Sequence, residues 1–319
     1  MRTGKPVDIN RLRHLYPFES HYLDRSGIRY HYLDEGRGNP VVMVHGNPTW
    51  SFYYRELVKA VSPHFRAVVP DHIGCGLSDK PDSAAYPYRA ADRVADLEAL
   101  LDHLQLREKL TLVVHDWGGA IGLALAVRHP RRFARLVILN TAAFLPPRGK
   151  RLPRRLRIIR NVRPLAVPAV LGLNLFSRGA LWMAAHRKLA PEVRAGLTAP
   201  YNSWRNRLAT LKFVQDIPVK ESDPSFALIQ DLDRRLSTLA HLPTLICWGA
   251  EDFVFDHDYL DEWVRRFPRA EVHCLSGAGH YVLEDAPELV VDLVSGFLQR
   301  HPLAAEPMAG DGGLAGDAR

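Results

Sequence analysis

The stretch VVHDWGGAIG, which surrounds Asp116, constrains the fold more than any other part of the chain. Residues 110–116 form an apolar run typical of a buried strand, and residues 117–130 have the composition of a helix that ends at a proline. Asp116 stands between them, with Val114 and Gly118 two positions away on either side. A strand-to-helix turn with small flanking residues strains the backbone and lifts its central side chain above the sheet. The stretch therefore predicts a carboxylate presented at the end of a buried strand.

An aspartate at this place is also an ordinary N-cap for the helix that follows. In either role, the amide groups at the helix N-terminus favour the ionised carboxylate. The choice between a cap and a nucleophile therefore depends on whether the rest of the chain supplies partners for a nucleophile.

Strand and helix patterns alternate along most of the chain. Residues 28–36 alternate in the manner of an edge strand, and short apolar runs at 40–46 and 135–140 are typical of buried strands. Between them, residues 88–106 have helical spacing. This order predicts an α/β fold, with a mostly parallel central sheet and helices on both faces.

The alternation stops after Asn140 and resumes near residue 242, which predicts an inserted helical cap. The expected organisation is an N-terminal extension, a core in two parts around the cap, and a disordered tail rich in Gly, Ala and Pro. The bounds are 1–20 for the extension, 21–143 and 226–301 for the core, 144–225 for the cap and 302–319 for the tail.

Two residues late in the chain complete a nucleophile, base and acid. His280 follows the last predicted strand, where the base of such a triad belongs in chain order. Asp252 follows the preceding strand and is favoured as the acid that orients His280. Its neighbour Glu251 is a weaker candidate, and the alternative acid position is occupied by Asn140, a poor charge partner.

A turn early in the chain offers donors for an anion. After the strand that ends near His45, the backbone N–H groups of Asn47 and Trp117 are placed to face a developing oxyanion. The Asn47 amide and the Trp117 indole N–H are neutral side-chain donors suited to hold a leaving anion in an apolar cavity. Taken singly, Trp117 is better explained by core packing and Asn47 by a turn before Pro48.

Five motifs, HGNPTW, PDHIGCGLSDKP, HDWGGAIG, WGAEDF and GHYVLEDAPE, occur in this order and spacing. Together they resemble the haloalkane dehalogenase family of α/β-hydrolases, from about residue 20 to about residue 300. The resemblance implies that Asp116 is the nucleophile, His280 the base and Asp252 the acid. It also implies that Asn47 and Trp117 stabilise the leaving halide.

The cap sequence narrows the resemblance. LNTAAFLPPRG, LNLFSRGA and APYNSWRNRLATLKFVQDIPV are similar to the β-lactone decarboxylases of the bacterial long-chain olefin pathway. That branch converts cis-3,4-dialkyl-oxetan-2-ones to cis-alkenes and carbon dioxide. A substrate with two alkyl chains needs a long apolar tunnel, which residues 165–176 are suited to line, although the run is also typical of ordinary apolar core within a cap. The same run contains Pro168 and Gly172 and is too short and broken to span a bilayer.

Other activities stay open beside this lyase. The site residues are equally suited to a haloalkane dehalogenase, which releases halide and alcohol. An epoxide hydrolase is a further alternative, for which Tyr201 is a conceivable cap tyrosine, although Asn47 occupies a position that is typically aromatic there. A serine esterase is disfavoured because no G-x-S-x-G motif occurs. A scaffold that has lost its chemistry is disfavoured by the intact nucleophile, base and acid.

Charge and cysteine content bear on partners and location. The net charge of +7 is local, because residues 148–188 hold 11 of the 42 basic residues and no acidic residue occurs between Asp116 and Glu192. This segment is interpreted as a solvated helix face, a membrane-surface patch or a docking site for an acidic partner such as the β-lactone synthetase. It has no nucleic-acid recognition motif. Three scattered cysteines and the absence of a signal-peptide pattern favour a cytoplasmic protein, and no metal or organic cofactor is implied.

Overall fold

The computed structural model describes residues 4–147 and 149–303. Most of the tail expected to be disordered, residues 304–319, and Arg148 in the basic segment lie outside the described residues. Among the described residues, no single helix has the length and apolar character needed to cross a bilayer. A bent pair, Arg163–Gly172 with Leu175–Met183, meets that test only when the two helices are taken together.

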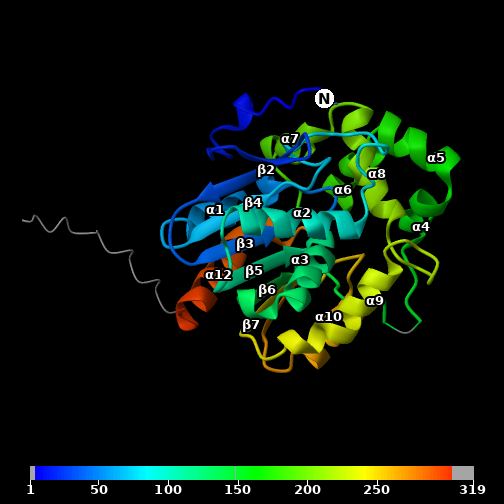
Figure 1. Cartoon of the computed structure of the whole chain (residues 1–319). Helices are drawn as coiled ribbons and strands as arrows, with labels where there is room; N and C mark the ends of the chain where they lie inside the picture. The colour runs from blue at the N-terminus through cyan, green and yellow to red at the C-terminus, as the bar shows by residue number, and fades with distance from the viewer. Residues whose placement is uncertain (1–3, 148, 304–319) are drawn as a thin grey trace, which may run out of the picture.

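The centre of the molecule is an eight-stranded sheet in the order β1-β2-β4-β3-β5-β6-β7-β8 (Figure 1). The strands from β4 and β3 to β8 run parallel, and β2 is antiparallel to both of its neighbours. The fold class predicted from the sequence is confirmed. The strands are β1 His21–Arg25, β2 Ile28–Glu35, β3 Pro40–Val44, β4 Arg66–Pro70, β5 Leu110–His115, β6 Phe133–Leu139, β7 Thr244–Gly249 and β8 Glu271–Leu275.

The prediction that residues 28–36 form an edge strand is wrong. This segment is β2, which is paired on both sides, with β1 and with β4. The edge strand on this side of the sheet is β1, a short hairpin partner whose exposed residues alternate with half-buried ones. The middle of β2 is buried because both faces of the sheet are covered there: Tyr30 and Tyr32 pack into one core and Leu33 into the other.

The parallel strands send alternate side chains into two separate cores. On β3, Val42 and Val44 pack into one core, whereas Val41 and Met43 pack into the other. A strand covered by helices on both faces buries every residue, which is why these strands appear as continuous apolar runs in the sequence. The first core contains residues of α2, α3, α9 and α10, and the second contains residues of α1 and α12.

The helices fall into two groups, those that cover the sheet and those inserted between β6 and α9. The covering helices are α1 Arg55–Val61, α2 Ala90–His103, α3 Trp117–Arg128, α9 Phe226–Arg235, α10 His257–Arg266, α11 Val282–Asp285 and α12 Pro287–Arg300. The inserted helices are α4 Arg154–Asn161, α5 Arg163–Val167, α6 Leu175–Met183, α7 Pro191–Thr198 and α8 Leu208–Gln215.

The inserted helices lie within residues 144–225, where the cap is predicted; in Figure 1, α4, α5, α6 and α8 gather on the right of the molecule and α7 lies near the top centre. The division of the chain into domains stays a prediction. The cap contacts the core at Gly196 of α7, whose carbonyl accepts a hydrogen bond of 3.0 Å from Trp50 Nε1. A Cβ at Gly196 would overlap the buried ring of Phe52, so the contact requires glycine.

Candidate active site

Asp116 occupies the turn between β5 and α3, as the sequence predicts. Its backbone has a φ of 49°, in the left-handed region that non-glycine residues rarely adopt. Two glycines permit the turn to sit close to the preceding loop. A Cβ at Gly46 would overlap the carboxylate of Asp116, and a Cβ at Gly118 would overlap the carbonyl of Val44. The strained turn and the close approach together hold the carboxylate at the end of the sheet.

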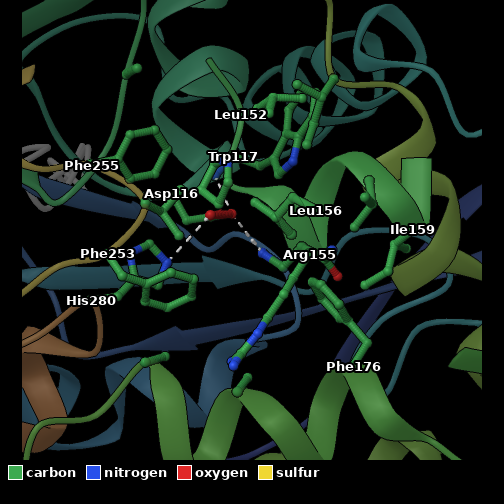
Figure 2. A pocket seen from close by; sticks show the side chains of 18 of the residues that line it. Asp116, Trp117, Leu152, Arg155, Leu156, Ile159, Phe176, Phe253, Phe255 and His280 are labelled. Carbon is green, nitrogen blue, oxygen red and sulfur yellow. Dashed lines mark hydrogen bonds and ion pairs between the residues drawn. The ribbon is translucent and has the colours of Figure 1, made fainter. Parts of the chain in front are cut away.

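The two oxygens of Asp116 have different surroundings. Oδ1 accepts hydrogen bonds from the backbone N–H groups of Asn47, at 2.9 Å, and Trp117, at 2.6 Å. Oδ2 lies 3.4 Å from Nε2 of His280, longer than is usual for a charge-assisted hydrogen bond (Figure 2). Oδ1 is therefore fixed and Oδ2 is the oxygen with freedom to react.

His280 is held between two carboxylates. Its Nδ1 lies 2.8 Å from Oδ2 of Asp252, and its Nε2 faces Asp116. The other oxygen of Asp252 accepts hydrogen bonds from the backbone N–H groups of Val254 and Phe255, at 2.7 and 3.1 Å. The structure thus brings together the three side chains predicted from the sequence: a hydrogen bond joins Asp252 to His280, and a longer ion-pair contact joins His280 to Asp116.

Burial and charge set the protonation of this line. Burial opposes protonation of His280, but the charge of Asp252 and the hydrogen bonds to both carboxylates outweigh it and raise the pKa of His280 to about 10. Burial likewise opposes ionisation of Asp116, but the hydrogen bond and charge of His280 prevail and lower its pKa. At neutral pH the resting site therefore contains an imidazolium beside an ionised nucleophile.

The two side-chain donors predicted for an anion lie at the same cavity. Asn47 and Trp117 both line it, and the Trp117 indole N–H has no hydrogen-bond partner among the described residues. The Asn47 amide donates one hydrogen bond of 3.0 Å to the carbonyl of Thr210 on α8, which leaves a second amide hydrogen available. The cap thus fixes the orientation of the Asn47 side chain.

Two residues that the sequence did not assign to the site support it. Asn140 donates a hydrogen bond of 3.0 Å to Oδ2 of Asp252. The residue at the alternative acid position therefore orients the acid itself. His115 contacts the backbone carbonyl of His280 through Nε2, at 2.8 Å, and burial lowers the pKa of His115 to about 3. The only sequence signal for either residue is its place at the end of a buried strand.

Two alternative candidates lie away from the chemistry. Glu251 is exposed, whereas its neighbour Asp252 is buried and bonded to His280. Tyr201 is buried, and its hydroxyl faces the carbonyl of Thr49 at 3.3 Å rather than the cavity of Asp116. The structure therefore does not bring Tyr201 into position to protonate an epoxide oxygen in that cavity.

A cavity of about 600 Å³ opens above Asp116, between the carboxyl ends of the parallel strands and the cap (Figure 2). Its wall is mainly apolar and includes Leu156 and Ile159 of α4 and Phe176 of α6. Four residues of the run 165–176 line it, as the tunnel prediction anticipates, namely Ala169, Val170, Leu175 and Phe176. Within the described residues, no cluster of three or more His, Cys, Asp or Glu is arranged to hold a metal ion.

Comparison with known proteins agrees with this geometry. The model of the alpha/beta hydrolase fold family matches residues 39–287. Two proteins named cis-3-alkyl-4-alkyloxetan-2-one decarboxylase are similar over most of the chain. The relative from Shewanella oneidensis is 51% identical, over 89% of this chain and 89% of its own length. The relative from Xanthomonas campestris is 44% identical, over 90% of this chain and 98% of its own length.

Haloalkane dehalogenases are more distant relatives. Haloalkane dehalogenase 2 of Mycobacterium tuberculosis is 33% identical, over 89% of this chain and 96% of its own length. Among solved structures, the haloalkane dehalogenase DbeA of Bradyrhizobium elkani superposes with a TM-score of 0.78 and 28% identity, covering 89% of this chain and 98% of that one.

Proposed function

The chain belongs to the α/β-hydrolase family, and we propose that within this family it is a β-lactone decarboxylase that converts cis-3-alkyl-4-alkyl-oxetan-2-ones to cis-alkenes and carbon dioxide. The observation that carries the proposal is the 51% identity to a decarboxylase of that name over 89% of the chain, against 33% for a dehalogenase over the same share. The apolar cavity above Asp116 suits a substrate with two alkyl chains.

The first step is a displacement at the ring carbon that bears oxygen, C4. Oδ2 of Asp116 attacks C4, the ring C4–O bond breaks, and its electron pair goes to the ring oxygen, which becomes part of a free carboxylate on C3. The side chains of Asn47 and Trp117 stabilise that leaving carboxylate. Oδ1 stays in place because two backbone N–H groups hold it.

The second step restores the nucleophile. The C3–carboxylate bond breaks and releases carbon dioxide, its electron pair forms the C3–C4 double bond, and the ester bond from C4 to Oδ2 breaks. Inversion at C4 followed by departure from opposite faces converts a cis-lactone to a cis-alkene. The charge that returns to Asp116 is stabilised by the same two N–H groups and by the His280 imidazolium.

In this route His280 stays an imidazolium and stabilises the Asp116 carboxylate as it departs from C4 in the second step. No water takes part in the reaction. The raised pKa of His280 keeps it protonated while Asp116 is ionised. Asp252 orients the ring through Nδ1. The role of base, which the family resemblance implies for His280, applies when water must be activated, as it must be for ester hydrolysis.

The alternative is haloalkane dehalogenase activity, which the relatives of that name favour. Attack on an alkyl halide by Oδ2 forms the same kind of ester, but release requires water. Esterification removes the negative charge of Asp116, so the pKa of His280 falls and the ring can accept a proton from water. An epoxide hydrolase is disfavoured because Tyr201 faces away from the cavity.

The deciding experiment compares two substrates with one enzyme. Purified protein receives a cis-3,4-dialkyl-β-lactone or a 1-bromoalkane of similar length, and alkene is followed by gas chromatography and bromide by ion chromatography. We expect alkene from the lactone, little bromide, and loss of both in Asp116→Asn, by about 10⁴-fold or more because the nucleophile is removed. Release of bromide at enzymatic rates, without formation of alkene, would show that the protein is a haloalkane dehalogenase instead.

The proposed reaction also indicates which class of enzyme must supply the substrate. Its lactone must come from an enzyme that closes a four-membered ring on a β-hydroxy acid, which in the olefin pathway is the β-lactone synthetase. We propose that this enzyme is cytoplasmic, because its three scattered cysteines are typical of a reducing compartment. Fractionation of the native cells, followed by detection of this chain and of alkene-forming activity, tests that location.

A further inference from the structure

The sequence leaves two partners open for the basic segment of the cap, an acidic protein and a membrane surface. We propose that the cap docks on an anionic lipid bilayer, with the mouth of the Asp116 cavity turned toward the lipid. The purpose of docking rests on the proposed function, because a dialkyl lactone and a long alkene both partition into hydrocarbon. The docking itself is argued from charge, exposure and the position of the mouth.

The cap has a surplus of cations. Within residues 149–188 of the cap, eight exposed basic side chains have no carboxylate within ion-pair distance among the described residues, namely Arg151, Arg154, Arg155, Arg157, Arg163, Arg178, Arg187 and Lys188. Two others are neutralised, since Lys150 pairs with Asp256 and Asp258, and Arg160 pairs with Asp223. Clustered unpaired cations are attracted to an anionic lipid surface.

The cap also exposes large apolar side chains. Of fourteen exposed large hydrophobic residues in the described chain, nine lie within residues 144–225. They include Leu165 at 61% exposed, Leu173 at 65% and Trp182 at 62%. Tryptophan and aliphatic side chains beside cations are typical of surfaces that seat in the headgroup region of a bilayer.

The mouth of the cavity opens on this surface. Ile158, Leu175 and Met183 are exposed and at the same time line the cavity that contains Asp116. Arg151 and Arg155 are exposed at the same wall, and Figure 2 shows Arg155 extending from α4 toward α6. An apolar substrate can therefore pass from lipid to the nucleophile between apolar side chains and beneath cations that contact headgroups.

These observations favour lipid over an acidic protein. An acidic protein would match the cations, but it would need an apolar patch of its own to cover the exposed leucines and tryptophans. Hydrocarbon below a layer of anionic headgroups matches both kinds of side chain. Docking on such a bilayer accounts for the presence of exposed cations and exposed apolar side chains on the same cap.

The test measures binding without substrate. Sedimentation with vesicles of phosphatidylglycerol and phosphatidylcholine, or of phosphatidylcholine alone, compares the wild type with Arg154→Glu/Arg157→Glu. Neither arginine lines the cavity. The matched control is Arg128→Glu/Arg131→Glu, which makes the same change in net charge at exposed positions outside the cap. Thermal unfolding verifies that all three proteins are folded.

We expect the wild type and the control to bind the anionic vesicles at low salt, and the cap variant to bind at least tenfold more weakly. Binding should weaken in high salt, because salt screens exposed charges. Failure of the wild type to bind anionic vesicles at low salt, or equal weakening in both variants, would overturn the proposal. Binding to purified β-lactone synthetase that is lost in the cap variant, without vesicle binding, would assign the surface to a protein instead.

A second arm connects docking to catalysis. Lactone is supplied in anionic vesicles or in neutral detergent micelles, and alkene is measured in both. The cap variant should lose at least tenfold in rate with vesicles and keep the wild-type rate with micelles, whereas equal rates in vesicles would count against a lipid-facing mouth. If no lactone is converted in either form, the proposed function fails, while the vesicle-binding result stands independently.

Discussion

At the scale of single residues, the division of labour between the oxygens of Asp116 is the central property of the site. Oδ1 has two backbone donors, and Oδ2 has only the longer contact with His280. A carboxylate fixed in this way loses little freedom when Oδ2 attacks, because its plane is already set. The same two backbone N–H groups then stabilise the Asp116 carboxylate when its ester bond to C4 breaks.

Replacement of His280 should make the intermediate visible. In His280→Ala the imidazolium beside Asp116 is absent, so departure of the carboxylate loses electrostatic stabilisation. We expect alkene formation to slow by about 10²–10⁴-fold. The protein should gain the full mass of the lactone on the peptide that contains Asp116, as measured by intact-mass and peptide mass spectrometry.

The double variant Asp116→Asn/His280→Ala provides the control and should gain no mass. An unmodified His280→Ala chain after exposure to lactone would contradict an ester intermediate whose release depends on His280. The same variant with a bromoalkane should retain the alkyl group, because no base remains to activate water.

At the scale of elements, the loop that carries His280 is tied to the cap through one carboxylate. Asp285 is fully buried and accepts hydrogen bonds of 2.8 Å from the backbone N–H groups of Gly279, His186 and Arg187. In the same region, the N–H of Tyr281 donates to a carbonyl at the end of α6. The catalytic histidine loop and the end of α6 are therefore one hydrogen-bonded unit.

Asp285→Asn should loosen that unit without touching the reacting atoms. An amide nitrogen cannot accept from a backbone N–H, so at least one buried donor is left unpaired, at a cost of about 1–3 kcal/mol in stability. Asp285 is a positioning residue, so we expect kcat to fall about tenfold. Hydrogen exchange should become faster at the amides of Gly279, His186 and Arg187.

The matched control is Asp223→Asn in the turn after α8. Asp223 accepts backbone hydrogen bonds from Val219 and Lys220, far from the His280 loop in sequence and without contact to it. This variant should keep kcat. Unchanged exchange at the three amides in Asp285→Asn, together with unchanged kcat, would show that the carboxylate does not position His280.

At the scale of the whole molecule, three buried histidines make the fold sensitive to acid. Burial is the main cause that lowers the pKa values of His45, His72 and His115. Below the ordinary histidine value, the unfolded chain binds protons that the folded chain does not, so stability is present at neutral pH and is lost as pH falls. The raised pKa of His280 acts at higher pH, where stability is lost as pH rises toward about 10.

Chemical denaturation at pH 7.5, 6.0 and 5.0 should therefore show a steep acid limb. Each histidine contributes at most about 1.4 kcal/mol per pH unit between its folded pKa and the ordinary value, so the three together contribute at most about 4 kcal/mol per unit below pH 6. His72→Gln should reduce that slope. Equal unfolding free energies at pH 7.5 and 5.0 would contradict this account.

The sequence by itself determined the parts of this protein that depend on local pattern. The apolar run of β5, the turn at Asp116 and the glycines that follow specify a strand-to-helix turn because each acts on backbone a few residues away. Chain order then indicated His280 and Asp252, since residues at the carboxyl ends of parallel strands meet at one edge.

Only the tertiary structure decided which groups touch across long separations in the chain. It paired β2 on both sides, turned Tyr201 away from the cavity, and set Asn140 as a clamp on Asp252. It also revealed that the cap orients Asn47 through Thr210. These contacts depend on how helices and strands pack, and packing is specified by the shapes of many side chains together rather than by any short pattern.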